Sequence, residues 1–137
     1  MGFPGLELKI RMSLVAGPDV RVFVPVRLYY KSTDPYAVQF SFDVTPEHVV
    51  LWTLARELLD QGLTAPAGIG DVKITPIGPH QNRRFSIELE SPDGYARLEG
   101  PAAPIKAWLT KTFEVVPAGR ESGFVDVDSF LDELLTR

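Results

Sequence analysis

The sequence contains no cysteine and only two histidines among its 137 residues. Without cysteine the chain can form no disulfide, no thiolate zinc site and no iron–sulfur cluster, and it has no thiol nucleophile. The histidines, His48 and His80, stand far apart, and neither has a second ligand at the spacing that a metal site requires. The sequence therefore shows no visible catalytic or metal centre, and we expect no cofactor.

Basic residues are not in excess. The chain has 14 Lys and Arg against 18 Asp and Glu, a formal net charge of −4. Residues 1–120 hold thirteen of each sign, so the whole imbalance falls in the acidic segment 121–137. Proteins that bind nucleic acid normally carry a basic excess, because Lys and Arg displace counterions from the phosphates. The charge distribution therefore disfavours a nucleic-acid partner.

Long apolar runs are also missing. No stretch approaches the roughly 18 apolar residues that a membrane-spanning helix needs. The first residues have no basic region followed by an apolar stretch, so no signal peptide is expected. We therefore expect no membrane insertion and a cytoplasmic location.

Two short motifs resemble functional signatures but do not meet their requirements. Gly68-Ile69-Gly70 looks like part of a phosphate-binding loop, yet such a loop must open a helix and here a strand is predicted to follow. Turn geometry that requires glycine explains these residues better. Acidic pairs such as Glu88 and Glu90 alternate along a strand, a pattern typical of a solvated face.

Alternating apolar and polar residues predict two blocks of strands. The first block covers 6–12, 20–30 and 38–44 and ends in a short apolar run, 48–52; the second covers 71–77, 84–90 and 95–100. Pro25 lacks an N–H group and indicates a sheet edge or a bulge within the second strand. Residues 91–94, Ser-Pro-Asp-Gly, predict a hairpin turn.

Each block of strands is followed by a predicted helix. Leu54, Ala55, Leu58 and Leu59 form an apolar stripe and predict a helix over about 53–61, with Gly62 as a left-handed cap; a start at Pro46 is the alternative. A second helix is predicted from Pro104 to about 113. Asp128 can cap a short last helix in the acidic segment.

This order predicts a single α+β domain over 1–137 with mostly antiparallel sheets. Its halves, about 6–63 and 69–114, repeat the order strands then helix, and the acidic C-terminal segment 121–137 follows. The faint similarity between the halves leaves a duplication open.

Five blocks of the chain resemble the SsgA-like proteins, a sporulation and cell division family of actinobacteria. They are residues 34–38, 52–63, 66–72, 91–94 and 116–119, in family order. Each block alone is weak, but five in sequence over nearly all of 6–135 are specific. Leu54 and Glu57 are small, conservative departures from the family pattern.

The resemblance implies a non-enzymatic role in placing division septa. Family members help to localise the tubulin-like protein FtsZ, promote its assembly at sporulation septa, and act with one another. The implied fold is Whirly-like, with two antiparallel sheets, and the implied assembly is a homotrimer. Because that fold also resembles proteins that hold single-stranded nucleic acid, strand binding is the alternative function, although fold likeness is only analogy.

The helix after Trp52 supplies the candidate partner contacts. The predicted helical stripe leaves Arg56, Glu57 and Asp60 on the polar face, where a division protein could touch them. An ordinary solvated helix face is the competing interpretation. No catalytic, cofactor-binding or metal-binding residue is predicted.

Overall fold

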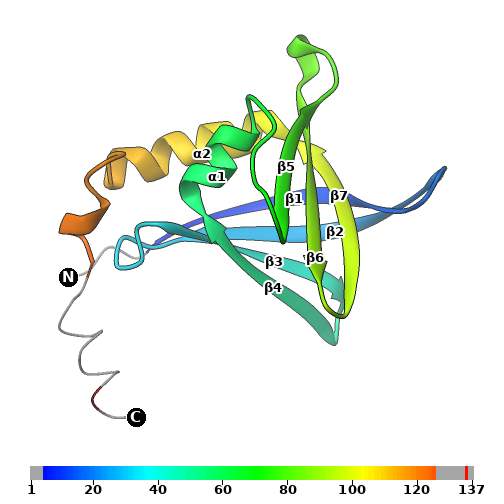
Figure 1. Ribbon diagram of the computed structural model, residues 1–137, viewed down its shortest axis with the longest axis horizontal. Coiled ribbons are helices and arrows are strands. Elements are labelled where there is room, and N and C mark those ends of the chain that lie inside the picture. The colour runs from blue at the N-terminus through cyan, green and yellow to red at the C-terminus, as the bar shows by residue number, and fades with distance from the viewer. Residues whose placement is uncertain (1–4, 126–134, 136–137) are drawn as a thin grey trace.

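The computed structural model describes residues 5–125 and Leu135, and its strands form one seven-stranded antiparallel sheet in the order β4-β3-β2-β1-β7-β6-β5 (Figure 1). The strands are β1 (Leu6–Gly17), β2 (Val20–Tyr30), β3 (Ala37–Thr45), β4 (His48–Ala55), β5 (Val72–Ile77), β6 (Arg84–Ser91) and β7 (Gly94–Pro101). The helices are α1 (Arg56–Gly62) and α2 (Ala102–Val115), with short 3₁₀ turns η1 (His80–Asn82) and η2 (Glu121–Gly123). The α+β class and the order strands, helix, strands, helix are confirmed.

The prediction of two sheets is wrong. The two blocks of strands join through β1 and β7, where Ser13 pairs with Glu99 and Leu14 with Leu98. This contact joins residues that are far apart in the sequence, so local alternation could not reveal it. What looked like two sheets are two wings of one sheet.

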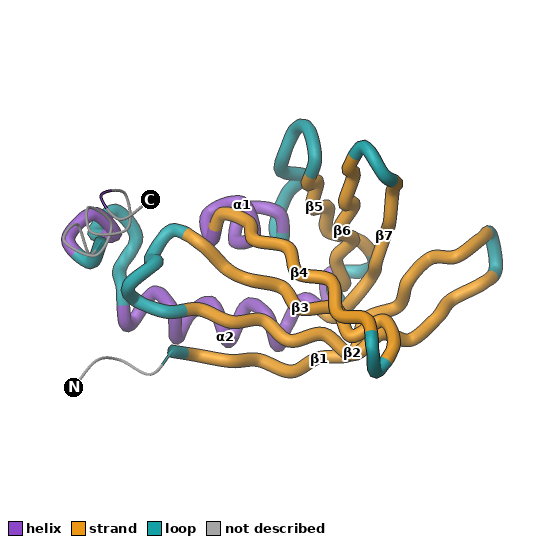
Figure 2. Tube along the Cα trace, turned by 90° about the horizontal axis from the view of Figure 1, so that it is seen from below, coloured by secondary structure: helices purple, strands orange, loops and turns teal. Residues whose placement is uncertain are grey.

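The two wings cross, so that the sheet curls into a half-barrel. In Figures 1 and 2, β5–β7 run across the direction of β1–β4. Both helices lie against the inner face of the curl, toward one end, and leave the other end of that face uncovered. We call these two parts of the inner face the covered end and the open end.

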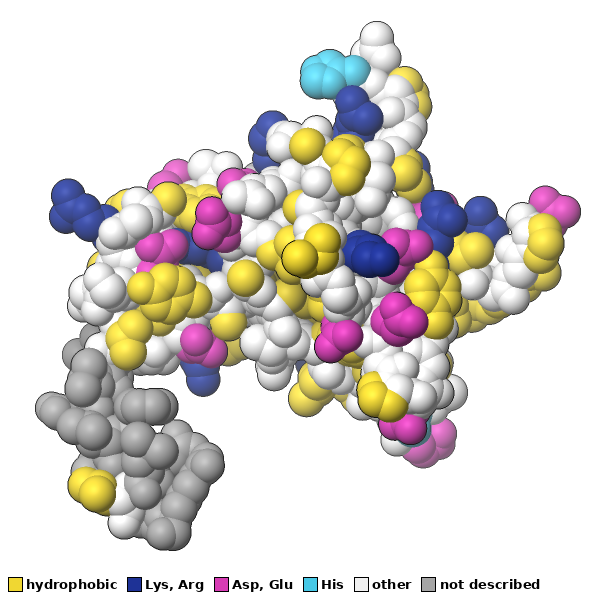
Figure 3. All heavy atoms as spheres, in the orientation of Figure 1, with side chains coloured by type: hydrophobic (Ala, Val, Ile, Leu, Met, Phe, Trp, Pro, Cys, Tyr) yellow, Lys and Arg dark blue, Asp and Glu magenta, His cyan; other side chains and the backbone are white. Residues whose placement is uncertain are grey.

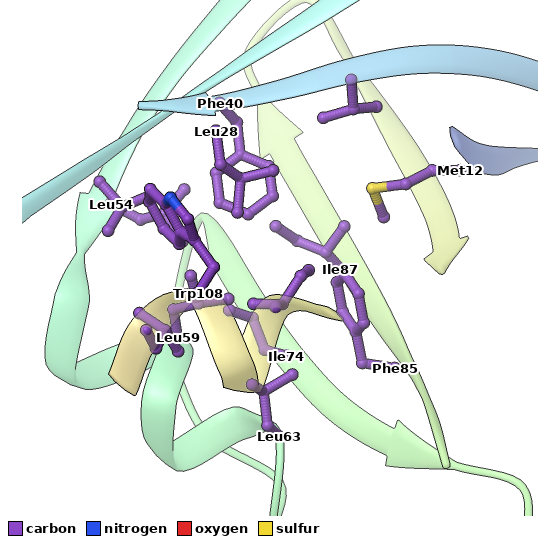
Figure 4. Close-up of a cluster of buried hydrophobic side chains, with 14 of the residues drawn as sticks. Met12, Leu28, Phe40, Leu54, Leu59, Leu63, Ile74, Phe85, Ile87 and Trp108 are labelled. Carbon is purple, nitrogen blue, oxygen red and sulfur yellow. The ribbon is translucent and has the colours of Figure 1, made fainter. Parts of the chain in front are cut away.

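The main core lies at the covered end (Figure 4). Along β3 the inner side chains Val38, Phe40 and Phe42 are buried while Gln39 between them is exposed, as alternation predicts. Trp108 of α2 and Leu59 of α1 pack over this face and are themselves buried. Burying each such side chain contributes about 1.5–3 kcal/mol, and this burial fixes the helices on the sheet.

Helix α1 starts later than the apolar stripe suggested. Residues 48–55 continue as β4, so the helix begins at Arg56 rather than near 53, and a start at Pro46 is excluded. Gly62 is not a left-handed cap either, because its φ is not positive. Glycine is needed at position 62 because there is no room for a side chain. A Cβ there would lie 2.4 Å from the Cβ of Ile74, so glycine lets α1 approach β5 closely.

Several turns match their predictions. Residues 91–94 close the β6–β7 hairpin, where Ser91 pairs with Gly94. Pairing between β2 and β3 begins at Val26, so Pro25 lies where β2 has β1 as its only partner strand among the described residues.

Helix α2 begins at Ala102, two residues before the predicted Pro104. The helix predicted from Asp128 lies outside the described residues.

Neither helix could serve as a membrane span. Within residues 5–125, α1 and α2 are both shorter than a bilayer crossing requires.

Candidate functional site

The predicted contact residues line a cleft of about 450 Å³ beside α1, which we call the α1 cleft. Its walls come from α1, from the end of α2 and from the segment after it, so both halves of the chain contribute. The lining residues are Tyr36, Ala55, Arg56, Glu57, Asp60, Gln61, Phe113, Ala118, Gly119 and Glu121.

Arg56 does not lie on the polar face of α1, so that part of the prediction is wrong. The prediction began the helix near 53, but β4 continues to Ala55 and Arg56 is the first helical residue. Its side chain is 1% exposed and points into the protein, with its guanidinium carbon 4.1 Å from the ring centre of Phe113 and 5.0 Å from that of Tyr30. A desolvated cation between two aromatic rings gains about 2 kcal/mol from such contacts.

The guanidinium of Arg56 also connects the two halves through hydrogen bonds. One terminal nitrogen donates to the carbonyl oxygen of Thr112 on α2 at 3.1 Å, and the other donates to Oε2 of Glu121 at 3.1 Å. The Nε atom is buried and has no partner among the described residues. Because α1 starts at this residue, one side chain ties α1, α2 and the segment at η2 together.

Two ionisable groups around Arg56 have shifted pKa values. The backbone N–H of Glu121 itself, and then the Arg56 guanidinium, hold the pKa of the Glu121 carboxyl below its usual value. Burial raises the pKa of Tyr30, and Arg56 partly opposes that shift. The Tyr30 hydroxyl donates to the carbonyl oxygen of Pro35 at 3.0 Å, so its proton has a structural use.

Glu57 and Asp60 do lie on the exposed side of α1, as predicted. Glu57 accepts a hydrogen bond from Nε2 of Gln61 at 3.1 Å, one turn further along the helix. Together with Glu121 they give the α1 cleft an acidic rim over a buried cation. This arrangement suits contact with a polar or basic protein surface. A phosphate group would instead be repelled by the carboxylates at the rim, which carry the same sign of charge.

The open end of the sheet forms a second hollow, an apolar groove of about 280 Å³. Sequence reasoning missed it, because its side chains follow the same alternation as the core. The lining residues are Leu14, Val24, Phe42, Val44, Val50, Trp52, Leu89, Ser91, Asp93, Gly94, Tyr95, Ala96 and Leu98. Asp93 is the one charged residue in this lining, so the groove is suited to apolar side chains.

The residues considered for other chemistry are dispersed. His48 begins the edge strand β4 and His80 begins η1, both exposed. Gly68 and Gly70 have φ values of +95° and +96°, which confirms that turn geometry requires them. Within residues 5–125 and Leu135, no three His, Asp or Glu side chains come together as a metal site would need.

Comparison with known proteins gives one consistent result. Residues 24–121 match the family model described as "Streptomyces sporulation and cell division protein, SsgA". A curated relative from Frankia casuarinae, named sporulation-specific cell division protein SsgB, is 39% identical over 94% of this chain and 89% of its own length. The protein of that name from Streptomyces coelicolor is 38% identical over 95% of both chains.

Solved structures agree with these matches. A crystal structure described as an SsgA-like sporulation-specific cell division protein from Thermobifida fusca superposes with a TM-score of 0.83 at 36% identity, covering 97% of this chain and 98% of that one. Within the family the sequence alone favours SsgB, and the curated relatives described above carry that name.

Proposed function

The chain belongs to the SsgA family of sporulation and cell division proteins, and from that membership we propose that it is a non-enzymatic regulator that helps to localise FtsZ and promotes FtsZ assembly at division septa. The observation that carries the proposal is the match to proteins named sporulation-specific cell division protein SsgB over 95% of both chains. In this proposal the protein works in the cytoplasm at the septum and contacts other SsgA-like proteins as well as FtsZ.

The contact with FtsZ is assigned to the exposed side of the α1 cleft. Glu57 and Asp60 lie there on a short helix that Arg56 holds in place from below. Arg56 is too deeply buried to touch a partner, so its role in the proposal is to position α1 and Glu121.

The family resemblance adds a homotrimer and a Whirly-like arrangement to the proposal. A trimer would present three copies of the α1 cleft to one filament. Several weak contacts on a single particle raise avidity through effective concentration, without any new kind of contact. A binding scaffold of this kind needs protein-binding surface and no catalytic group.

Light scattering of purified FtsZ with and without this protein tests the proposal. We expect the protein to increase the scattering that accompanies polymerisation. The parallel measurement is fluorescence anisotropy of a labelled single-stranded oligonucleotide at two salt concentrations. Salt-sensitive binding to the oligonucleotide, combined with no effect on FtsZ, would replace the proposal with strand binding.

Two charge-reversal variants with the same change in net charge test the contact surface. The variant Glu57→Lys with Asp60→Lys alters the α1 cleft, and the control Glu7→Lys with Glu90→Lys alters exposed acidic residues on the strands. We expect the first variant to lose most of the effect on FtsZ and the control to keep it. Equal losses in both would show that overall charge matters and would remove the assignment to α1.

A further inference from the structure

The hairpin of β1 and β2 extends beyond the rest of the sheet. On one side of it, pairing between β1 and β7 is confined to Ser13 and Leu14; on the other, pairing of β2 with β3 begins at Val26. Among the described residues, the stretch 15–23, which we call the arm, has strand partners only within the hairpin of β1 and β2. Figures 1 and 2 both show the arm projecting past β7.

The arm exposes apolar side chains on both of its faces. Val20 is 53% exposed, Val22 47% and Phe23 69%. Val20 and Val22 lie on the same side of β2 as Val24, which lines the apolar groove, while Phe23 faces the other way and lies under the Arg11 guanidinium at 5.6 Å. Figure 3 shows hydrophobic atoms at the surface along this projection. A two-stranded hairpin is marginally stable in water, so a projecting apolar arm gains stability when a partner covers it.

The arm and the apolar groove cannot cover each other within one chain. Leu14 and Val24 are at once the base of the arm and part of the groove wall. The strands continue straight outward from that wall, so the arm leads away from the groove it helps to build. The described residues thus leave both an apolar projection and an apolar hollow uncovered, and a second copy of the chain can bring the two together.

We propose that the apolar groove is the docking site for the arm of a second copy of this chain. Val20 and Val22 of one copy would lie against the groove side chains of the next, among them Val44, Val50 and Trp52. Neither the inner side of the arm at Val20 and Val22 nor most of the groove lining carries charge, so the contact requires no buried ion. Covering both surfaces at once removes the apolar groove and the exposed arm from water.

The contact joins two different surfaces, so it is heterologous. Such a contact closes into a ring when the rotation that relates one copy to the next is a whole fraction of a full turn. It therefore supplies an interface for the homotrimer, and the number of copies in the ring rests on the proposed function. The contact between arm and groove does not depend on that number.

Three valine-to-aspartate variants with nearly equal exposure provide the test. Val22→Asp places a charge on the arm, Val44→Asp places one on the groove lining, and Val49→Asp places one on the opposite face of β4; these valines are 47%, 48% and 47% exposed. Each is measured by size-exclusion chromatography with light scattering, and circular dichroism confirms folding. We expect the first two variants to lose the wild-type oligomer and the third to retain it.

Mixing the two defective variants makes the test specific for this contact. The Val44→Asp chain keeps an intact arm, and the Val22→Asp chain keeps an intact groove. One competent pair remains, so the mixture should form a one-to-one dimer that neither variant forms alone. Absence of that dimer, with both variants monomeric, would overturn the docking of arm into groove.

The remaining outcomes separate this inference from the proposed function. A monomeric wild-type chain would overturn both the contact and the homotrimer. An oligomer that persists in the Val22→Asp and Val44→Asp variants would overturn the contact and leave the homotrimer standing. Loss of the oligomer in all three variants, Val49→Asp included, would also overturn the contact and leave the homotrimer standing. If removing residues 126–137 from Val22→Asp shifts its tryptophan emission to the red, the groove holds the chain's own C-terminal segment, and the second copy is excluded.

Discussion

The covered end and the open end of the inner face are made by the same strands and follow the same alternation, yet they are completed differently. At the covered end, Phe40 on β3 lies under Trp108 and is fully buried. Four residues further along the same strand, Val44 is 48% exposed and lines the groove. Helices α1 and α2 cover one end of the inner face and not the other. The alternation of apolar and polar residues alone therefore does not distinguish a face that helices cover from one that is available to a partner.

Charge differs between the two ends as well. The covered end buries one cation, Arg56, and gives its guanidinium aromatic rings, a carbonyl and a carboxylate. The groove lining at the open end contains only Asp93 as a charged residue. A buried charge that is held by several directed contacts fixes one arrangement of the elements around it, whereas an apolar surface accepts any partner of matching shape.

The largest effect is expected from removing the buried cation. Arg56→Ala takes away hydrogen bonds to Thr112 and Glu121 and empties the space between Tyr30 and Phe113. We expect the free energy of unfolding to fall by about 3 kcal/mol in a urea titration. The control Arg27→Ala removes an exposed ion pair with Asp43 at 3.4 Å and should cost less than about 1 kcal/mol. Equal losses in the free energy of unfolding would show that Arg56 stabilises the covered end no more than an exposed ion pair does.

A matched pair of valines on β3 compares the two ends directly. Val38 is 0% exposed and pairs with Leu54, and Val44 is 48% exposed in the groove; both face inward. For the monomeric Val22→Asp background we expect Val38→Ala to cost about 2 kcal/mol and Val44→Ala less than about 0.5 kcal/mol. If Val44→Ala costs as much as Val38→Ala under these conditions, the open end is packed within the single chain.

The smallest effect concerns pH. The lowered pKa of Glu121 means that its carboxylate stabilises the folded state at pH values above the ordinary glutamate pKa of about 4.3, and this contribution is lost as the pH falls through the lower folded value. Glu121→Gln should therefore reduce stability at neutral pH and make no difference at the acid limit. The measurement is urea unfolding of both proteins across this pH range. A difference that persists unchanged at low pH would contradict the ion pair with Arg56.

The sequence predicts the strands well because the alternation of buried and exposed side chains along a strand can be read from neighbouring residues. Alternation located β3 and β6, and the Ser91–Gly94 pair confirms the turn between β6 and β7. The joining of two wings into one sheet rests on Ser13 and Leu14 meeting β7, a contact that no local pattern encodes.

The site was only partly predictable for the same reason. Glu57 and Asp60 are exposed as their helical spacing indicates, but Arg56 is buried because Tyr30, Phe113 and Glu121 converge on it from distant parts of the chain. The apolar groove could not be foreseen, since Val44 and Trp52 carry the pattern of core residues and only the placement of α2 leaves them uncovered.

The junction between β1 and β7 also has a consequence for how the chain is made. Ser13 and its partner Glu99 are 86 positions apart, the difference between their residue numbers. At about 5–20 residues per second, β7 leaves the ribosome roughly 4–17 seconds after β1. The hairpin of β1 and β2 needs only neighbouring residues and can form within microseconds. During translation the first wing is therefore assembled with one side of β1 unpaired, and closure of the curled sheet is a late step that awaits the second wing.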